Sequence, residues 1–129
     1  MRQVINTNKA PKAIGPYSQA IAINGMIFTS GQIPIDPNTG NLIRDDFNLE
    51  VLQIINNIKA ILEEGGSNLN DVVKYTVYLT DLSLFPILNK IFDDFYSDNI
   101  PPARSTIQVS ALPKDVRVEI EAIASIEDV

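Results

Sequence analysis

The stretch Pro101 to Ala124, PPARSTIQVSALPKDVRVEIEAIA, contains two runs of alternating residues on either side of a short turn. The turn, Leu112 to Asp115, includes a proline, and this pattern is typical of a β-hairpin. Strand side chains alternate between two faces, so one face suits a core: Ala103, Ser105, Ile107, Val109, Val116, Val118, Ile120 and Ala122. The other face carries Arg104, Thr106 and Glu119. We therefore expect this hairpin to present polar chemistry on a rigid sheet.

The composition limits both the size of the fold and its chemistry. With 129 residues, of which 45% are hydrophobic, the chain is long enough for one domain with its own core, so we expect residues 1–129 to form a single domain. It has no cysteine, histidine or tryptophan. This excludes disulfides, thiolate nucleophiles, imidazole bases and zinc sites built from Cys or His. Catalysis would have to use carboxylates, hydroxyls, backbone groups, Arg or Lys.

The charge and hydropathy patterns bear on possible partners. Ten basic and sixteen acidic residues give a net charge of -6, which repels a polyphosphate partner unless a basic patch compensates, and the sequence has no such patch. The N-terminal residues lack the apolar segment of a signal peptide, and no apolar run approaches the roughly 20 residues that span a bilayer. We expect a soluble, cytoplasmic protein without a membrane partner.

The first third of the chain predicts short strands. Arg2 to Ile5 is a candidate strand and is followed by a loop rich in Asn, Lys, Pro and Gly. Ser18 to Ile23 and Met26 to Ser30 are apolar runs separated by Asn24-Gly25. Both positions of that dipeptide tolerate positive φ, so the segment predicts a hairpin.

The middle of the chain alternates between helix and strand patterns. Apolar residues recur every three or four positions from about Asn48 to Glu64, and Gly65-Gly66 then supplies a left-handed stop. Val72 to Thr80 is rich in β-branched and aromatic residues, which predicts a central strand. A second amphipathic helix begins at a cap, Asp81 or Ser83, and continues to about Ser97.

Two helices can cover only one face of the resulting α+β sheet, which we expect to be mixed and mainly antiparallel. The other face is left partly apolar and partly polar, and exposed apolar sheet surface on this scale usually indicates association. We therefore expect a closed homo-oligomer with the polar groups of the last hairpin at the junctions between subunits.

Five blocks of sequence, in this order and spacing, resemble the reactive intermediate deaminase family of RidA type, also called the YjgF family. The resemblance covers nearly the whole chain. The blocks are Ala13-Ile14-Gly15-Pro16-Tyr17-Ser18-Gln19, Ser30-Gly31-Gln32-Ile33-Pro34, Val73 to Asp81, Pro102-Ala103-Arg104-Ser105-Thr106, and Leu112-Pro113-Lys114 with Val118-Glu119-Ile120-Glu121-Ala122.

The resemblance implies a homotrimer of chorismate-mutase-like α+β subunits, whose sheets form a central barrel with clefts between subunits. It implies hydrolysis of 2-imino acids, which derive from 2-aminoacrylate and 2-aminocrotonate, to 2-oxo acids and ammonia. It also implies that no cofactor is needed.

Two charged side chains are the main candidates for the chemistry. A planar guanidinium at Arg104 matches the substrate carboxylate with two donors, as an ammonium cannot. On pattern alone, an Arg on a solvated strand face is the simpler interpretation, and the resemblance reverses that preference. Glu119 is the candidate acid and base, which would deprotonate water and protonate the leaving nitrogen. In the predicted hairpin Glu119 opposes Gln108, roughly 13 Å from Arg104 along the same face.

Four further residues are candidates for substrate binding. Thr106 offers one hydrogen bond where many relatives have cysteine, which argues against obligatory thiol chemistry. Tyr17 ends a Gly-Pro loop that could close the cleft. Ser30 and Gly31 follow a strand, and Gly31 permits close approach of the backbone. Asn89, on the second helix, is a weaker candidate. For each of them an ordinary packing or solvating role remains open.

Two other functions remain open. Some relatives are described as ribonucleases or translation inhibitors, but the acidic charge and the absence of histidine weigh against a nucleic-acid partner. A ligand-sensing trimer without turnover would keep Arg104 and make Glu119 dispensable.

Overall fold

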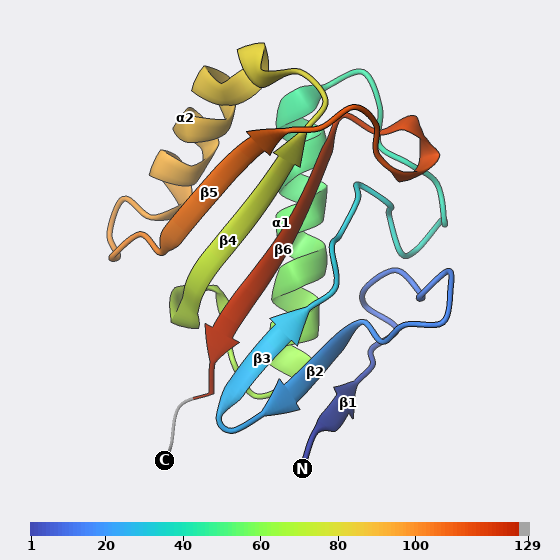
Figure 1. Cartoon of the computed structure of the whole chain (residues 1–129), viewed down its shortest axis with the longest axis vertical. Helices are drawn as coiled ribbons and strands as arrows, with labels where there is room; N and C mark the ends of the chain where they lie inside the picture. The colour runs from blue at the N-terminus through green and yellow to red at the C-terminus, as the bar shows by residue number, and fades with distance from the viewer. Residues whose placement is uncertain (127–129) are drawn as a thin grey trace.

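Residues 1–126, which the computed structural model describes, form a six-stranded sheet with two α-helices (Figure 1). The strands are β1 (Gln3–Ile5), β2 (Ala20–Ile23), β3 (Met26–Thr29), β4 (Val72–Leu79), β5 (Ala103–Gln108) and β6 (Val118–Ser125), and the helices are α1 (Phe47–Glu64) and α2 (Phe85–Phe95). The strand order is β1-β2-β3-β6-β4-β5, in which only β4 and β5 are parallel. The α+β class and the mainly antiparallel sheet are confirmed.

Local sequence signals explain the ends of the first elements. Asn24 and Gly25 have φ angles of 52° and 74°, as the tight turn between β2 and β3 requires. Asp46 caps α1, because its carboxylate accepts a hydrogen bond from the Leu49 amide at 3.1 Å. Gly66, with φ of 84°, provides the left-handed residue after this helix.

The second helix begins and ends slightly differently from the prediction. Asp81 caps a 3-10 turn at Leu82–Leu84, and α2 follows directly. Pro86 lies in the first turn of α2, where its missing N–H leaves no hydrogen bond unmade. The helix ends at Phe95 and not at Ser97.

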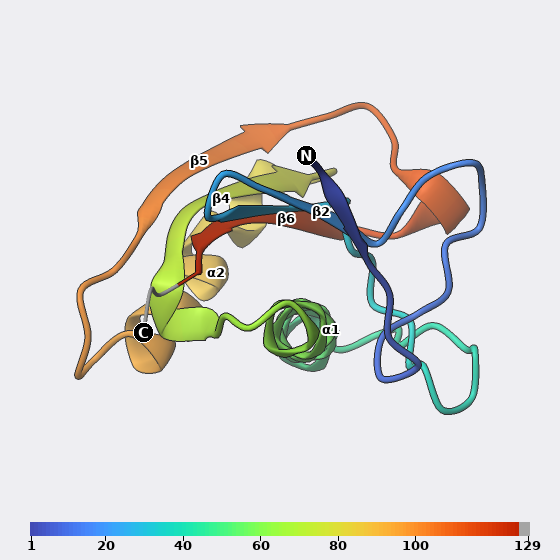
Figure 2. The same ribbon diagram turned by 90° about the horizontal axis from the view of Figure 1, so that it is seen from below.

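The core lies between the sheet and the helices, which both pack on one side of it (Figure 2). From α1 it takes Val51, Ile54 and Ile58, all fully buried. From the sheet it takes alternate residues of β4 and β6, such as Val77 and Ile120. Each such side chain contributes about 1.5–3 kcal/mol by its burial.

The predicted hairpin of the last two strands is wrong, because β4 lies between β5 and β6. Tyr75 of β4 pairs with Arg104 on one side and with Ala122 on the other. The apolar strand β4 therefore lies inside the sheet between two neighbouring strands, and the more polar β5 lies at its edge. The chain reaches β5 through α2, and such a helical crossover returns a strand parallel to the one before it.

The predicted faces of β5 are also wrong. Arg104 and Thr106 are half-buried on the side of α2, whereas Ser105 is exposed and Ile107 is 46% exposed. The parallel register with β4 sets this parity, because Arg104 pairs with the buried Tyr75. In β6 the prediction is correct, and Val118, Ile120 and Ala122 face the helices.

The face of the sheet without helices, called the open face below, carries apolar and acidic side chains. Phe28 is 43% exposed there, and Ile107 lies on the same face. Glu119 and Glu121 project from β6 on this face, and Tyr78 projects from β4 beside them. The sheet is not closed, since β1 and β5 each have a strand on one side only.

Every helix within residues 1–126 is too short or too polar to span a bilayer.

Candidate functional site

A cavity of about 300 Å³ contains four of the residues predicted for the site, and we call it the Glu119 pocket. One wall is the loop of residues 11–17, which ends at Tyr17. The opposite wall is formed where β3 gives way to a loop, at Ser30 and Gly31, and where Glu119 projects from β6. Segments far apart in the sequence therefore meet in this pocket.

The carboxyl group of Glu119 lies against the backbone of Gly31. A Cβ atom added at Gly31 would lie 2.8 Å from Glu119 Cδ and 3.1 Å from Cγ, so a side chain at this position would displace the Glu119 carboxyl group. Burial raises the pKa of Glu119, and the like charge of Glu121 raises it further. A carboxyl group with a raised pKa keeps its proton more readily than an ordinary carboxyl group, which suits it to act as an acid and then as a base.

Glu121, the neighbouring acid on the same face, has a partner of its own. The Tyr78 hydroxyl donates to Glu121 Oε1 at 2.8 Å. This hydrogen bond to Glu121, with burial and the carboxylate charges, raises the pKa of Tyr78 to about 12. The two acids thus differ, because Glu121 is engaged by a phenol and Glu119 faces a cavity.

Ser30 and Tyr17 have hydroxyl groups that already serve the loop. Ser30 Oγ donates to the Ser18 carbonyl at 2.6 Å, so its hydrogen is not free for a ligand. The Tyr17 hydroxyl accepts from the Ile14 amide at 3.1 Å and still has a hydrogen to donate. The structure therefore gives Ser30 a part in fixing the loop, whereas Tyr17 keeps a donor at the pocket.

Arg104 lines a different cavity, of about 630 Å³, between α2 and β5, which we call the Arg104 pocket. Its Nη2 donates to Asn89 Oδ1 on α2. The guanidinium carbon lies 5.5 Å from the ring centre of Phe85 and 5.1 Å from that of Phe92. Burial lowers the pKa of Arg104, yet a guanidinium remains charged in proteins. An amide and two aromatic rings thus hold the guanidinium in one orientation, as binding of an anion requires.

Thr106 follows Arg104 by two positions and lies on the same side of β5. Its Oγ1 is buried and has no hydrogen-bond partner among residues 1–126. A buried hydroxyl without a partner costs about 1–3 kcal/mol. Thr106 is not among the residues that line the Arg104 pocket, so the structure does not bring its hydroxyl to that cavity.

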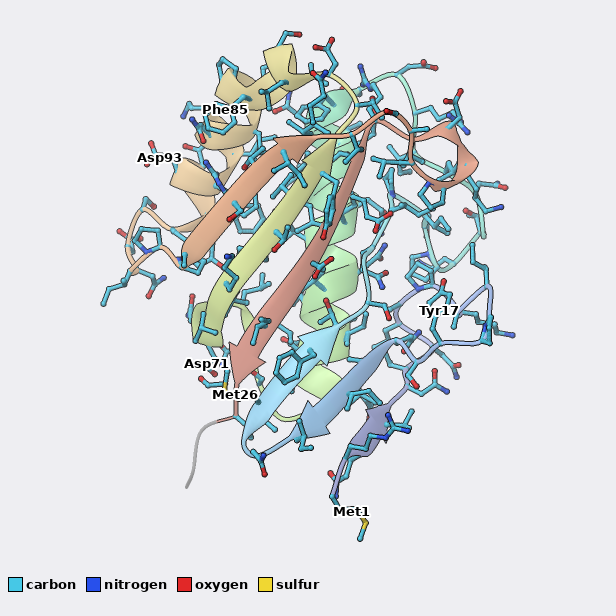
Figure 3. All side chains as sticks on the ribbon, in the orientation of Figure 1. Met1, Tyr17, Met26, Asp71, Phe85 and Asp93 are labelled. Atoms are coloured by element: carbon cyan, nitrogen blue, oxygen red, sulfur yellow. The ribbon has the colours of Figure 1, made fainter. Side chains whose placement is uncertain are left out.

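One chain does not bring the two pockets together. Arg104 and Ala122 flank Tyr75, and Glu119 lies three residues along β6 from Ala122. Two strand spacings and three residues put the Cα atoms of Arg104 and Glu119 about 14 Å apart. Their side chains also leave opposite faces of the sheet, so the expectation of one shared face is wrong. In Figure 3, Phe85 of α2, which lies beside Arg104, is at the upper left, and Tyr17 of the loop that lines the Glu119 pocket is at the right of the view.

Sequence reasoning missed one polar residue near the site and underrated another. Gln19 is buried and hydrogen-bonded to the loop of residues 7–11. The only signal for its burial in the sequence is its position next to an apolar strand. Asn89 contacts Arg104, which the spacing of α2 alone does not reveal.

The acidic side chains of the described residues were the remaining candidates for metal ligands. No group of three or more Asp or Glu side chains within residues 1–126 is placed to hold a metal ion, and the sequence has no His or Cys.

The raised pKa of Glu119 predicts a pH-dependent effect on stability. Above the folded-state pKa an ionised carboxylate is held in a partly dry place, which costs stability. Well below the ordinary pKa of 4.5 the group is protonated in both the folded and the unfolded state, so this cost is absent. Glu119→Gln should therefore raise the thermal midpoint at pH 7.5, and the gain should disappear as the pH falls toward 4. Thermal melts of both proteins across this range measure the effect. Asp98→Asn, at an exposed acid after α2, should show no such gain. Equal midpoints of Glu119→Gln and wild type at every pH would contradict the prediction.

The chain is similar to known proteins of about its own length. Residues 7–126 match the family model described as Endoribonuclease L-PSP. A RutC family protein of Pyrococcus abyssi is 54% identical, over 95% of this chain and 96% of its own. The 2-iminobutanoate/2-iminopropanoate deaminase of Salmonella typhimurium is 44% identical, over 96% of this chain and 98% of its own. The crystal structure of Escherichia coli TdcF with bound serine has a TM-score of 0.91 and 42% identity, and the match covers 97% of this chain and 99% of that one.

Proposed function

The chain belongs to the YjgF/RidA family, and from this premise we propose that it is a deaminase that hydrolyses small 2-imino acids such as 2-iminobutanoate and 2-iminopropanoate. A relative that covers nearly the whole chain carries the name of this activity. The observation that supports the proposal most is the half-buried Glu119 carboxyl with its raised pKa, held against Gly31 in a cavity.

The reaction adds one water and releases one ammonia, and one carboxyl group can serve both steps. Protonated Glu119 gives its proton to the imine nitrogen, which makes the C=N carbon more electrophilic. The resulting carboxylate accepts a proton from water as the water oxygen bonds to that carbon. The same proton then goes to the nitrogen. As the C–N bond breaks, the hydroxyl group on the same carbon gives its proton to the Glu119 carboxylate, which leaves a 2-oxo acid and ammonia and restores the protonated acid. No oxidant or reductant is required.

Arg104 would hold the substrate carboxylate. A guanidinium forms two parallel hydrogen bonds to a carboxylate, and the rings and amide around Arg104 keep it oriented. Since Arg104 and Glu119 lie far apart in one chain, we propose that the Arg104 side of one subunit meets the Glu119 pocket of the next.

A closed homotrimer is the assembly that we propose for this arrangement. The open face has exposed apolar side chains such as Phe28 and Ile107, and the edge of β5 has no strand beside it. A ring of identical contacts satisfies both features in every subunit. Light scattering should give three times the chain mass of 14.2 kDa.

An assay coupled to a threonine or serine dehydratase tests the function directly. The dehydratase releases the enamine and imine, which also hydrolyse without a catalyst. Added protein should speed the appearance of the 2-oxo acid in proportion to its concentration. Equal rates with and without it would refute the proposal.

Gly31→Ala should lower activity while leaving the fold intact. The new methyl group would overlap the end of the Glu119 side chain, which is flexible and can move away. We expect a fall in kcat/KM of at least about tenfold, because a displaced acid loses its alignment with the substrate. Its thermal midpoint should stay close to that of the wild type. In the background of Glu119→Gln the same change should have much less effect, since the group that it displaces no longer reacts.

A nucleic-acid function has one observation in its favour, which is the description of the matching family model as an endoribonuclease. The net charge of -6 and the absence of histidine weigh against it. Salt-sensitive RNA binding by nuclease-free protein would revive this alternative.

A further inference from the structure

Gln19 is a buried glutamine whose side chain ties one loop to the sheet. It directly precedes β2 and is 2% exposed. Its Oε1 accepts from the Thr7 amide at 2.8 Å. Its Nε2 donates to the carbonyls of Thr7 at 3.1 Å and Pro11 at 2.8 Å, with Ala10 as a longer third acceptor at 3.4 Å. Both the oxygen and the NH2 group of the amide are therefore bonded to one segment of backbone.

The segment that Gln19 holds leads into the wall of the Glu119 pocket. Apart from the bond of Gln19 to the Pro11 carbonyl, the backbone of the wall loop, residues 11–17, makes two hydrogen bonds among the described residues. Both are local: Ile14 N donates to the Tyr17 hydroxyl, and Tyr17 N donates to the Gly15 carbonyl. Ile14 is 61% exposed, so apolar burial does little to fix it. The wall loop is thus held mainly at its ends, by Gln19 at Pro11 and by Ser30 at Ser18.

We propose that Gln19 is a positioning residue that holds the wall loop closed over the Glu119 carboxyl and thereby keeps bulk water out of the pocket. Its effect on turnover rests on the deaminase function proposed above, whereas its effect on the loop does not. The carboxyl group depends on this wall for its partly dry surroundings. Opening the loop would hydrate Glu119 and allow its pKa to fall toward the ordinary value.

Gln19→Met tests the proposal, because it keeps the length and volume of the side chain and removes every hydrogen bond of the amide. Hydrogen exchange should become at least about tenfold faster at Thr7 and in the wall loop, with β4 and β6 unchanged. The pKa of Glu119, followed by NMR of its side-chain carbon, should fall. In the deaminase assay, the limb of the kcat profile that Glu119 governs should move to lower pH by the same amount.

Ser67→Ala is the matched control. Ser67 is also buried, and its hydroxyl donates to the Ser125 carbonyl at 2.6 Å, away from the pocket. This variant should lower the thermal midpoint and leave both the exchange of the wall loop and the titration of Glu119 as in the wild type. If Gln19 had only a structural role, Gln19→Met would also lower the thermal midpoint without changing the exchange of the wall loop or the titration of Glu119. This result would overturn the proposal.

The outcome stays separable from that of the proposed function. If the wild type has no deaminase activity, hydrogen exchange of the wall loop and the titration of Glu119 still decide whether Gln19 holds the wall loop in place. If Gln19→Met does not fold, the wild type itself provides a test. Its Gln19 side-chain amide protons should exchange far more slowly than those of the exposed Gln3, and equal rates would overturn the proposal.

Discussion

Arg104→Ala should lower kcat/KM for imine hydrolysis by about 100- to 1,000-fold, because it removes the anchor of the substrate carboxylate. Truncating one partner of a desolvated, hydrogen-bonded charge pair costs about 2–5 kcal/mol, and about 1.4 kcal/mol is a factor of ten in rate. The fold should persist, since the side chain is only half-buried on an edge strand. Initial rates at several substrate concentrations, with circular dichroism of the variant, measure both effects.

Two companion variants show whether charge or geometry matters at this position. Arg104→Lys keeps the charge and loses the planar fork, so we expect it to recover only a small part of the activity. Lys90→Ala removes another cation from the Arg104 pocket, where Lys90 is exposed and paired with Asp94 at 2.7 Å. It should change the rate less than about threefold. An equal loss of kcat/KM in Lys90→Ala and Arg104→Ala would contradict a specific contact of Arg104 with the substrate. It would mean that the positive charge of the pocket alone attracts anions.

Glu119→Gln should lower kcat by about 10²- to 10⁴-fold, the range that general acid and base catalysis contributes. The amide has the same shape, so it can lie against Gly31 as the carboxyl does, but it can neither release nor accept the proton. KM should change little, since Arg104 still holds the substrate. Saturation kinetics of the variant separate the two constants.

Glu121→Gln is the matched change at the neighbouring acid. It removes a like charge from beside Glu119, so the pKa of Glu119 and the corresponding limb of the pH profile should move down. The maximal rate should remain within about tenfold of the wild type. If Glu119→Gln were as active as the wild type while Arg104→Ala failed to bind carboxylates, the chain would be a ligand sensor and not an enzyme.

Much of the fold follows from signals that act within a few residues. The Asn24-Gly25 turn and the left-handed Gly66 both depend on local backbone geometry, and both are where the sequence predicted them. The partner of β5 depends on long-range competition for places in the sheet. Alternation in β5 and β6 predicted two strands correctly, but it carries no information about β4 coming between them.

The candidate site was predictable as a set of residues and not as an arrangement. The family blocks indicated Tyr17, Ser30, Gly31 and Glu119, and the structure brings these four together in one cavity. Arg104 lies elsewhere because the parity of β5 follows the buried Tyr75 of β4 and not its own apolar residues. Spacing within one strand cannot reveal that constraint.

We propose that Arg104 and Glu119 act in one site and come from different subunits, and a mixture of two inactive variants tests this arrangement. Arg104→Ala and Glu119→Gln, unfolded together in equal amounts and refolded, form mixed assemblies. In a closed ring with random composition, about one junction in four then joins an intact Arg104 to an intact Glu119. We expect recovery of about a quarter of wild-type activity, whereas each variant refolded alone stays inactive. If the mixture were no more active than the separate variants, although mixed assemblies had formed, the shared site would be contradicted.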